Sequence, residues 1–239
     1  MQGDAQYAEG IVLDNNFLAN PEIHVCSTIF LVIVGSNAGP MQGLVRFPHL
    51  RLLSLAGNSL RSDDLLAERG TEFGELSMLN VSNNSLETLL PLSSAPRLSL
   101  LCARNCDTEA VPEEYIRSSQ LKAVDLQKNM IRSMVWARPG VLPALQLLDV
   151  SSNALGAGCW AQLAALTQLH ALAASRCGLS LPHDGNKLQQ WALPLLRRVH
   201  LDRNALSSVD FLGGCSALTR VSARRNALTS LPNLPAAQH

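Results

Sequence analysis

An eleven-residue pattern recurs along this chain and constrains its fold more than any other feature of the sequence. Residues 50–60 spell L-x-x-L-x-L-x-x-N-x-L without a mismatch. Five further segments repeat the pattern with valine, isoleucine or alanine at some leucine positions, and their asparagines are Asn84, Asn129, Asn153, Asn204 and Asn226. This regularity indicates a repeat architecture in which each unit buries its apolar face against the next.

Four more copies depart from the pattern at the asparagine or at the leucines. Cys106 and Cys177 stand at the asparagine position of two copies, and two weaker copies open the chain around Asn16 and Asn37. The ten key positions follow one another at spacings of 21 to 27 residues. We expect each L-x-L to form a short strand with inward leucines, paired in parallel with its neighbours. The asparagines and cysteines should satisfy buried backbone groups of the turns, so both cysteines are interpreted as structural thiols.

This repeat is similar to that of the leucine-rich-repeat family, and the resemblance covers residues 1–239 as a single domain. It implies an α/β fold, namely a right-handed solenoid or horseshoe with a concave parallel sheet of about ten strands and a convex side of mixed 3₁₀ and short helices. The short spacers resemble the phosphatase-regulator and dynein-light-chain subfamily. The longer spacers resemble ribonuclease-inhibitor repeats and predict short helices over 62–69, over 159–166 and around Trp191.

The residues that alternate with the inward leucines should line the concave face, where solenoids bind their partners. Counted six residues before each key position, this column is apolar over several consecutive repeats. We expect an apolar, partner-binding stripe at Leu31, Leu52, Met78, Leu100 and Leu147. Polar residues are ordinary at solvent-facing positions, and a contiguous apolar patch usually marks a partner site. The alternative is that these side chains lie over the strand edge and pack on one another.

The last three repeats instead collect basic residues at outward positions, with Asp202 as the lone acid among them. The predicted basic patch consists of Arg176, Arg197, Arg198, His200, Arg203, Arg220, Arg224 and Arg225. Like charges on adjacent strands repel, so an anionic partner would stabilise the cluster. An acidic peptide, a phosphorylated segment and an RNA backbone all fit, RNA least well because no aromatic residues interleave to stack bases. The alternative is an arginine-rich surface that is simply solvated.

The sequence carries no motif of a common catalytic or cofactor site. G-x-x-x-x-G-K, G-x-G-x-x-G and H-E-x-x-H are all missing from it. Cys102 and Cys106 are expected to diverge, one toward the concave face and one into the buried turn, which disfavours a zinc site. His200 and Asp202 are interpreted as a surface ion pair rather than a catalytic dyad, because no nucleophile accompanies them. We therefore expect no enzyme activity, no metal and no cofactor.

The cellular location of the protein is predicted from its cysteines, its apolar segments and the two ends of the repeat array. The six cysteines form no terminal disulfide framework, no charged and apolar leader precedes the first repeat, and the apolar run 29–34 is too short to span a bilayer. We expect an intracellular protein, cytoplasmic or cytoskeletal, with the cilium as one setting and no membrane contact. Neither end carries a polar cap, so neighbouring subunits, or more of a longer chain, are expected there.

Taken together, these features predict a non-catalytic protein-protein interaction scaffold. We expect a subunit or adaptor of a larger intracellular assembly, with a cytoskeletal or ciliary complex favoured and an acidic partner segment as one candidate. One alternative is a regulator or inhibitor of an enzyme such as a phosphatase. Another is a component of a ribonucleoprotein that uses the basic C-terminal part of the concave face.

Overall fold

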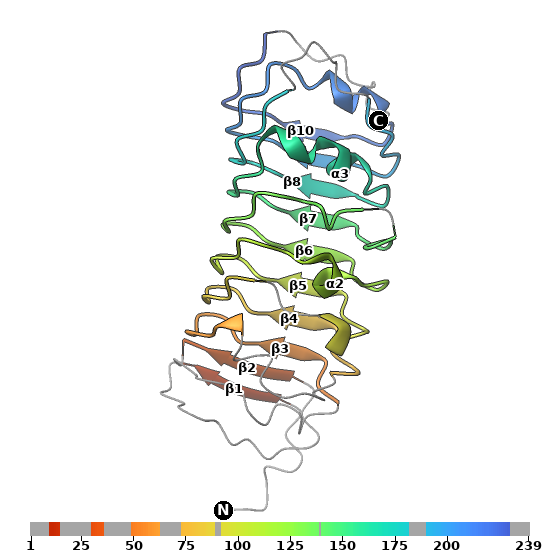
Figure 1. Ribbon diagram of the computed structural model, residues 1–239. Coiled ribbons are helices and arrows are strands. Elements are labelled where there is room, and N and C mark those ends of the chain that lie inside the picture. Colours follow the sequence, from red (N-terminus) through yellow and green to blue (C-terminus); the bar gives the residue numbers. More distant parts are fainter. Residues whose placement is uncertain are drawn as a thin grey trace, which may run out of the picture.

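The computed structural model describes residues 10–14, 30–35, 49–62, 73–88, 92–138, 140–181 and 190–229. Within these residues, ten short strands form one parallel sheet whose order follows the chain (Figure 1). The strands are β1 (Gly10–Asp14), β2 (Phe30–Val34), β3 (Leu52–Ser54), β4 (Met78–Asn80), β5 (Leu100–Cys102), β6 (Ala123–Asp125), β7 (Leu147–Asp149), β8 (Ala171–Ala173), β9 (Arg198–His200) and β10 (Arg220–Ser222). The predicted α/β leucine-rich-repeat solenoid with ten parallel strands is confirmed.

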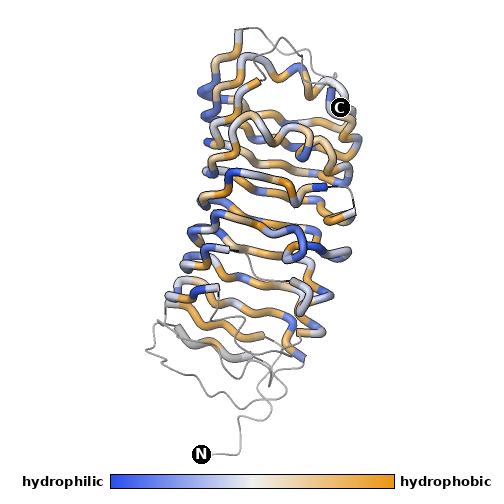
Figure 2. Tube along the Cα trace, viewed as in Figure 1, coloured by the Kyte–Doolittle hydropathy of each residue, from blue (hydrophilic) through white to orange (hydrophobic). Residues whose placement is uncertain are grey.

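The core runs along the whole stack rather than collecting at one centre. From β2 to β9 the second residue of each strand is buried, and neighbouring strands bring these residues into register, as in Leu53 with Leu79. Leu55 and Leu50, on either side of β3, are also fully buried. Burial of one such side chain stabilises the fold by about 1.5 to 3 kcal/mol. Figure 2 shows the resulting pattern, with apolar residues along the strands and polar residues along the edge where the strands end.

The asparagine column forms a ladder of hydrogen bonds inside the turns that follow the strands. The Asn129 amide nitrogen donates to the carbonyl oxygens of Ala103, at 2.8 Å, and Leu126, at 2.9 Å. Its amide oxygen accepts from the backbone N–H of Cys106, at 2.9 Å, and of Thr108, at 3.1 Å. One side chain thus satisfies four backbone groups that the turn would otherwise bury without partners.

Cysteine replaces only part of this function. The Cys106 thiol donates to the Val81 carbonyl at 3.2 Å, and the Cys177 thiol donates to the Val150 carbonyl at the same distance. A thiol offers no acceptor equivalent to the amide oxygen. The backbone carbonyl of Cys106 takes that role and accepts the N–H of Leu86 at 2.9 Å. The expectation that these cysteines stand in for asparagine as weak donors is confirmed.

Short helices and irregular segments cover the side of the sheet opposite the concave face. They are η3 (Leu92–Ser94), α2 (Glu113–Ile116), η4 (Gly156–Cys159), α3 (Trp160–Ala164) and η5 (Asp210–Gly214). The helix predicted over 159–166 is confirmed in η4 and α3, whereas the one predicted over 62–69 lies, apart from Ser62, outside the described residues. None of the helices among the described residues has the length and apolar character needed to cross a bilayer.

The helix predicted around Trp191 is wrong for the described residues 190–194, which form no helix. The Trp191 N–H donates instead to the Phe211 carbonyl of the next repeat at 2.8 Å. Its ring packs on Phe211, at 5.0 Å between ring centroids, and on Trp160, at 6.0 Å. These contacts between repeats therefore hold a segment without regular secondary structure, where its turn and proline signals favoured a helix.

The assignment of Leu31 to the concave face is also wrong. Leu31 is 0% exposed and pairs in register with the core residue Leu53, whereas Phe30 pairs with Leu52 and is 40% exposed. The segment 29–34 is apolar at every position, so a shift by one residue still buries apolar side chains. Pairing with β3 decides the register, and Phe30 takes the position predicted for Leu31.

Candidate functional site: the concave face

The first residues of the strands form a row of apolar side chains on the concave face. The register places Phe30 beside Leu52, Leu52 beside Met78 and Met78 beside Leu100. Leu147 follows after Ala123 and is 43% exposed. Gly10 accommodates the Phe30 ring, because a Cβ atom there would overlap it. We call the five side chains Phe30, Leu52, Met78, Leu100 and Leu147 the apolar row.

A hollow interrupts this row where the side chains become small. Ala123 stands between Leu100 and Leu147, and Ala171 follows on β8. The difference in side-chain size leaves a cavity of about 270 Å³ over β5 to β8, lined by these residues and by the two carboxylates described next. Its walls are almost wholly apolar, which suits one apolar side chain of a ligand.

Two carboxylates, Asp125 and Asp149, lie side by side at the third positions of β6 and β7 and border this hollow. Each accepts a hydrogen bond from the backbone two residues on, from Gln127 N–H at 2.9 Å and from Ser151 N–H at 2.8 Å. These bonds hold both side chains in place. Burial raises the pKa of Asp125 and the charge of Asp149 adds to this rise, whereas the Gln127 hydrogen bond and the charge of Arg104 oppose it. The acid pair is therefore a negatively charged spot, partly offset at Asp125 by the charge of Arg104, that a further cation would stabilise.

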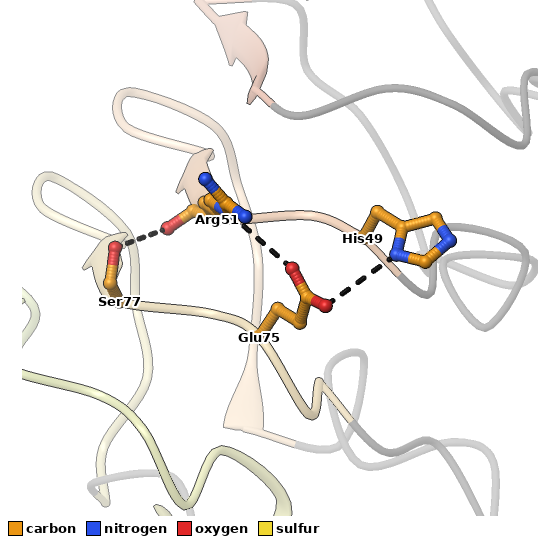
Figure 3. Close-up of polar contacts among 4 residues, drawn as sticks. All are labelled: His49, Arg51, Glu75 and Ser77. Carbon is orange, nitrogen blue, oxygen red and sulfur yellow. Dashed lines mark hydrogen bonds and ion pairs between the residues drawn. The ribbon is translucent and has the colours of Figure 1, made fainter.

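Two residues of the predicted basic patch form a second charged pair on the same face. Arg198 and Arg220 lie in register at the first positions of β9 and β10, and both are exposed. Among the described residues, no ion pair joins either of them to a carboxylate. Arg51, near the other end of the sheet, has such a partner, because its Nε lies 3.3 Å from Glu75 Oε2 (Figure 3). We call Arg198 and Arg220 the arginine pair.

Three other residues of the predicted basic patch form a separate row at the turns, which we call the turn row. Arg176, Arg203 and Arg225 each follow their strand and have φ angles of 56°, 57° and 57°, in the left-handed region. Gly57 and Asn83 occupy the equivalent turns of earlier repeats, and these residue types tolerate that region better than arginine. The charges of Arg176 and Arg225 lower the pKa of Arg203. The turn row therefore costs both backbone and electrostatic free energy. Arg203 and Arg225 lie beyond the ends of β9 and β10, five residues after Arg198 and Arg220.

Two further residues of the predicted basic patch, His200 and Arg224, line one cavity together with Arg220 and Asp202. Arg197 precedes β9, His200 ends it, and Arg224 lies two residues beyond β10. Arg224 therefore lies four residues further along its repeat than Arg220, at the other end of this cavity. The predicted basic residues thus comprise the arginine pair, with His200 and Arg224 near it, and the three arginines at the turns.

Asp202 has a structural role that the interpretation as an ion pair with His200 missed. Its Oδ1 accepts the Ser222 hydroxyl at 2.6 Å and the Arg224 N–H at 2.7 Å, so it joins the last two repeats. Burial acts to raise the pKa of Asp202, but these hydrogen bonds and the charges of Arg224 and His200 outweigh it and lower the pKa. Asp202 therefore remains an anion that fixes the turn after β10.

The two cysteines of the C-x3-C motif diverge as expected. Cys102 ends β5 on the concave face and is half-buried, whereas Cys106 is fully buried in the turn. Burial raises the pKa of Cys106 to about 11, so its thiol stays protonated at neutral pH and remains a hydrogen-bond donor.

Sequence reasoning missed Phe30, the acid pair and the hollow. The signal for the acid pair is present in the repeat frame, since Asp125 and Asp149 each precede a key asparagine by four residues. The signal for the hollow is the alternation of leucine and alanine from Leu100 to Ala171. Its depth depends on side-chain sizes in neighbouring strands and needs the sheet register.

Fold and surface together define a leucine-rich-repeat solenoid with an open concave face. No family model matches the chain, and no curated protein matches its sequence. Among solved structures, a leucine-rich-repeat protein of Leptospira interrogans is similar with a TM-score of 0.78 and 18% identity, over 96% of this chain and 58% of that one.

Two other solved structures share the fold. Internalin C2 from Listeria monocytogenes matches with a TM-score of 0.61 and 20% identity, over 90% of this chain and 80% of that one. The plant peptide hormone receptor RGFR1, solved in complex with RGF2, matches with a TM-score of 0.55 and 24% identity, over 78% of this chain and 30% of that one. Likeness at these identities shows the fold alone.

Proposed function

We propose that this chain is a non-catalytic protein-binding module and that its concave face is the contact surface. The observation that carries the proposal is the apolar row, which ends in the exposed side chains of Phe30 and Leu147. Single exposed apolar residues are ordinary on protein surfaces, but a row along one face is typical of a partner site. Covering it with a partner would remove apolar surface from water at about 25 cal/mol per Å².

The comparisons support this proposal at the level of the fold. RGFR1, whose structure contains bound RGF2, has a similar architecture. We extend the proposal to a subunit or adaptor of a larger assembly, cytoskeletal or ciliary, with the regulator of an enzyme and the ribonucleoprotein component as its alternatives. In β8 to β10 the described residues include no phenylalanine, tyrosine or tryptophan that could stack a base, which favours a protein partner over RNA.

The test is selection of binding peptides from a random display library with the full chain, followed by hydroxyl-radical footprinting. We expect bound peptides to protect Phe30, Met78 and Leu147. Met130 and Val135 serve as reference, because they are exposed in the spacer after β6. Protection confined to this spacer would contradict the proposal.

A pair of matched variants tests the same surface by affinity. Leu147→Asp places a charge in the apolar row, and Val135→Asp makes the same change at an exposed apolar side chain in the spacer. We expect the first variant to weaken binding of the selected peptides by about a hundredfold, as for loss of a central contact, and the second to leave it unchanged. Equal effects of the two variants would contradict the proposal.

A further inference from the structure

We infer that the concave face recognises an extended polypeptide segment in which basic and acidic residues are separated into two blocks. An apolar residue next to a basic residue would occupy β5 to β7, and acidic residues about four positions away would occupy β9 and β10. This inference rests on the function proposed above and names the chemistry of the partner that the same face would bind.

The hollow supplies the apolar contact. Leu100 and Leu147 wall it on two sides, and Ala123 forms its floor. Here a ligand side chain can enter between two leucines of the apolar row rather than rest on top of them. A leucine, isoleucine or methionine side chain has the size and chemistry for it.

The acid pair places a cation next to that apolar side chain. Asp125 and Asp149 border the hollow, two residues along the strands from Ala123 and Leu147. Both carboxylates are already held by backbone hydrogen bonds, so binding a cation requires little ordering of their side chains. A guanidinium or ammonium group would also screen the repulsion between them.

The arginine pair places anions at a fixed distance from this cation. From the middle of β6 and β7 to the middle of β9 and β10 are three strand spacings, or about 14 Å. An extended segment that runs across the strands covers this distance in about four residues at about 3.3 Å each, and residues four apart point to the same side. Between the two pairs, β8 presents only Ala171 and Ala173, which let a backbone approach the sheet closely.

The two pairs do not neutralise each other within the chain. Among the described residues no ion pair joins Asp125 or Asp149 to Arg198 or Arg220. β7 and β9 are two strand spacings apart, about 10 Å, which exceeds the screening length of about 8 Å at physiological salt. A uniformly acidic segment or a nucleic acid would meet the acid pair and be repelled there. A segment with separated charges complements both pairs at once.

The test uses two end-capped peptides of identical composition, each about ten residues long. In the segregated peptide a leucine and two arginines are followed, after two serines, by two glutamates. In the interleaved peptide the same arginines and glutamates alternate. Fluorescence anisotropy with the full chain should show that the segregated peptide binds at least about tenfold more tightly, and that added salt removes the difference.

Three variants and one control variant identify the residues that contact the peptide. Asp125→Asn with Asp149→Asn, and Arg198→Gln with Arg220→Gln, should each abolish the preference for the segregated peptide. The control, Glu109→Gln with Glu114→Gln, makes the same change in charge as the aspartate variant at exposed positions off the sheet and should preserve the preference. Ala123→Leu gives β6 the side chain of its neighbours and should weaken both peptides by about tenfold by filling the hollow.

The outcomes separate this inference from the proposed function. Equal binding of the two peptides, or a preference that survives both charge variants, would overturn the inference. If library-selected peptides still protected the apolar row in that case, the concave face would remain the binding surface and only the charge pattern would be wrong. If they did not, both would fail.

Discussion

Replacing Asn129 by alanine tests the physical basis of the repeat. The side chain is 8% exposed and makes four hydrogen bonds of 3.1 Å or less to backbone groups of two repeats. Alanine leaves two donors and two acceptors without these partners inside the turn. A buried polar group without a partner costs about 1 to 3 kcal/mol, and water that enters the vacated space recovers part of this. We expect the free energy of unfolding to fall by about 3 to 5 kcal/mol.

Cys106→Ala is the matched comparison, because it removes the same column position from a neighbouring repeat. The thiol makes one close hydrogen bond, to Val81 at 3.2 Å, and the backbone carbonyl of residue 106 continues to accept the Leu86 N–H. We expect a loss of about 1 to 2 kcal/mol from one weak bond and a small cavity.

Urea unfolding of the full chain, followed by circular dichroism, measures both losses. The slopes against urea must agree among the proteins, because repeat proteins can lose cooperativity and the midpoints are then not comparable. A loss under about 1 kcal/mol for Asn129→Ala, or equal losses for the two variants, would refute the argument that the amide satisfies four backbone groups.

Three further changes probe the core, the acid pair and the turn row. Leu148→Ala should lower the free energy of unfolding by about 2 to 5 kcal/mol, measured in the same urea experiment, and a loss under about 1 kcal/mol would mean that the side chain is not in the core. Asp125→Asn keeps the acceptor for Gln127 N–H and should raise the melting temperature at pH 7 by about 2 °C or less. The pKa of Asp125 is higher in the folded protein than its ordinary value of 3.8. The wild type should therefore lose stability relative to this variant as the pH rises from 3.8 through the pKa of the folded protein. Parallel profiles of stability against pH would contradict this. Arg203→Asn suits the left-handed backbone and removes repulsion, so thermal unfolding should occur at a higher temperature than in the wild type, and a lower one would show that the arginine is stabilising.

Most of the fold could be predicted because the information for each repeat is local. The leucine spacing fixes the inward face of a strand, and the asparagine fixes the turn that follows it, as Asn129 and Asn153 show. The same frame predicts that Cys106 and Cys177 are structural, and their hydrogen bonds to Val81 and Val150 confirm it.

The second repeat shows where local information ends. All residues from 29 to 34 are apolar, and either of two registers would bury apolar side chains there. The choice between Phe30 and Leu31 depends on pairing with β3, more than twenty residues away in the chain. The absence of a helix at residues 190–194 has the same origin, because the backbone N–H of Trp191 donates to Phe211 of the following repeat.

The sequence by itself therefore determined the repeat, the parallel order of the strands and the apolar character of the concave face, because each of these follows from spacings within one unit. Only the tertiary structure decided which side chains of different units become neighbours. It formed the hollow over Ala123, placed Asp125 beside Asp149, and placed Arg198 beside Arg220 on the sheet with Arg203 and Arg225 at the turns beyond. Spacers of unequal length separate these residues in the chain, and the sheet register, set by the packing of the whole core, brings them together.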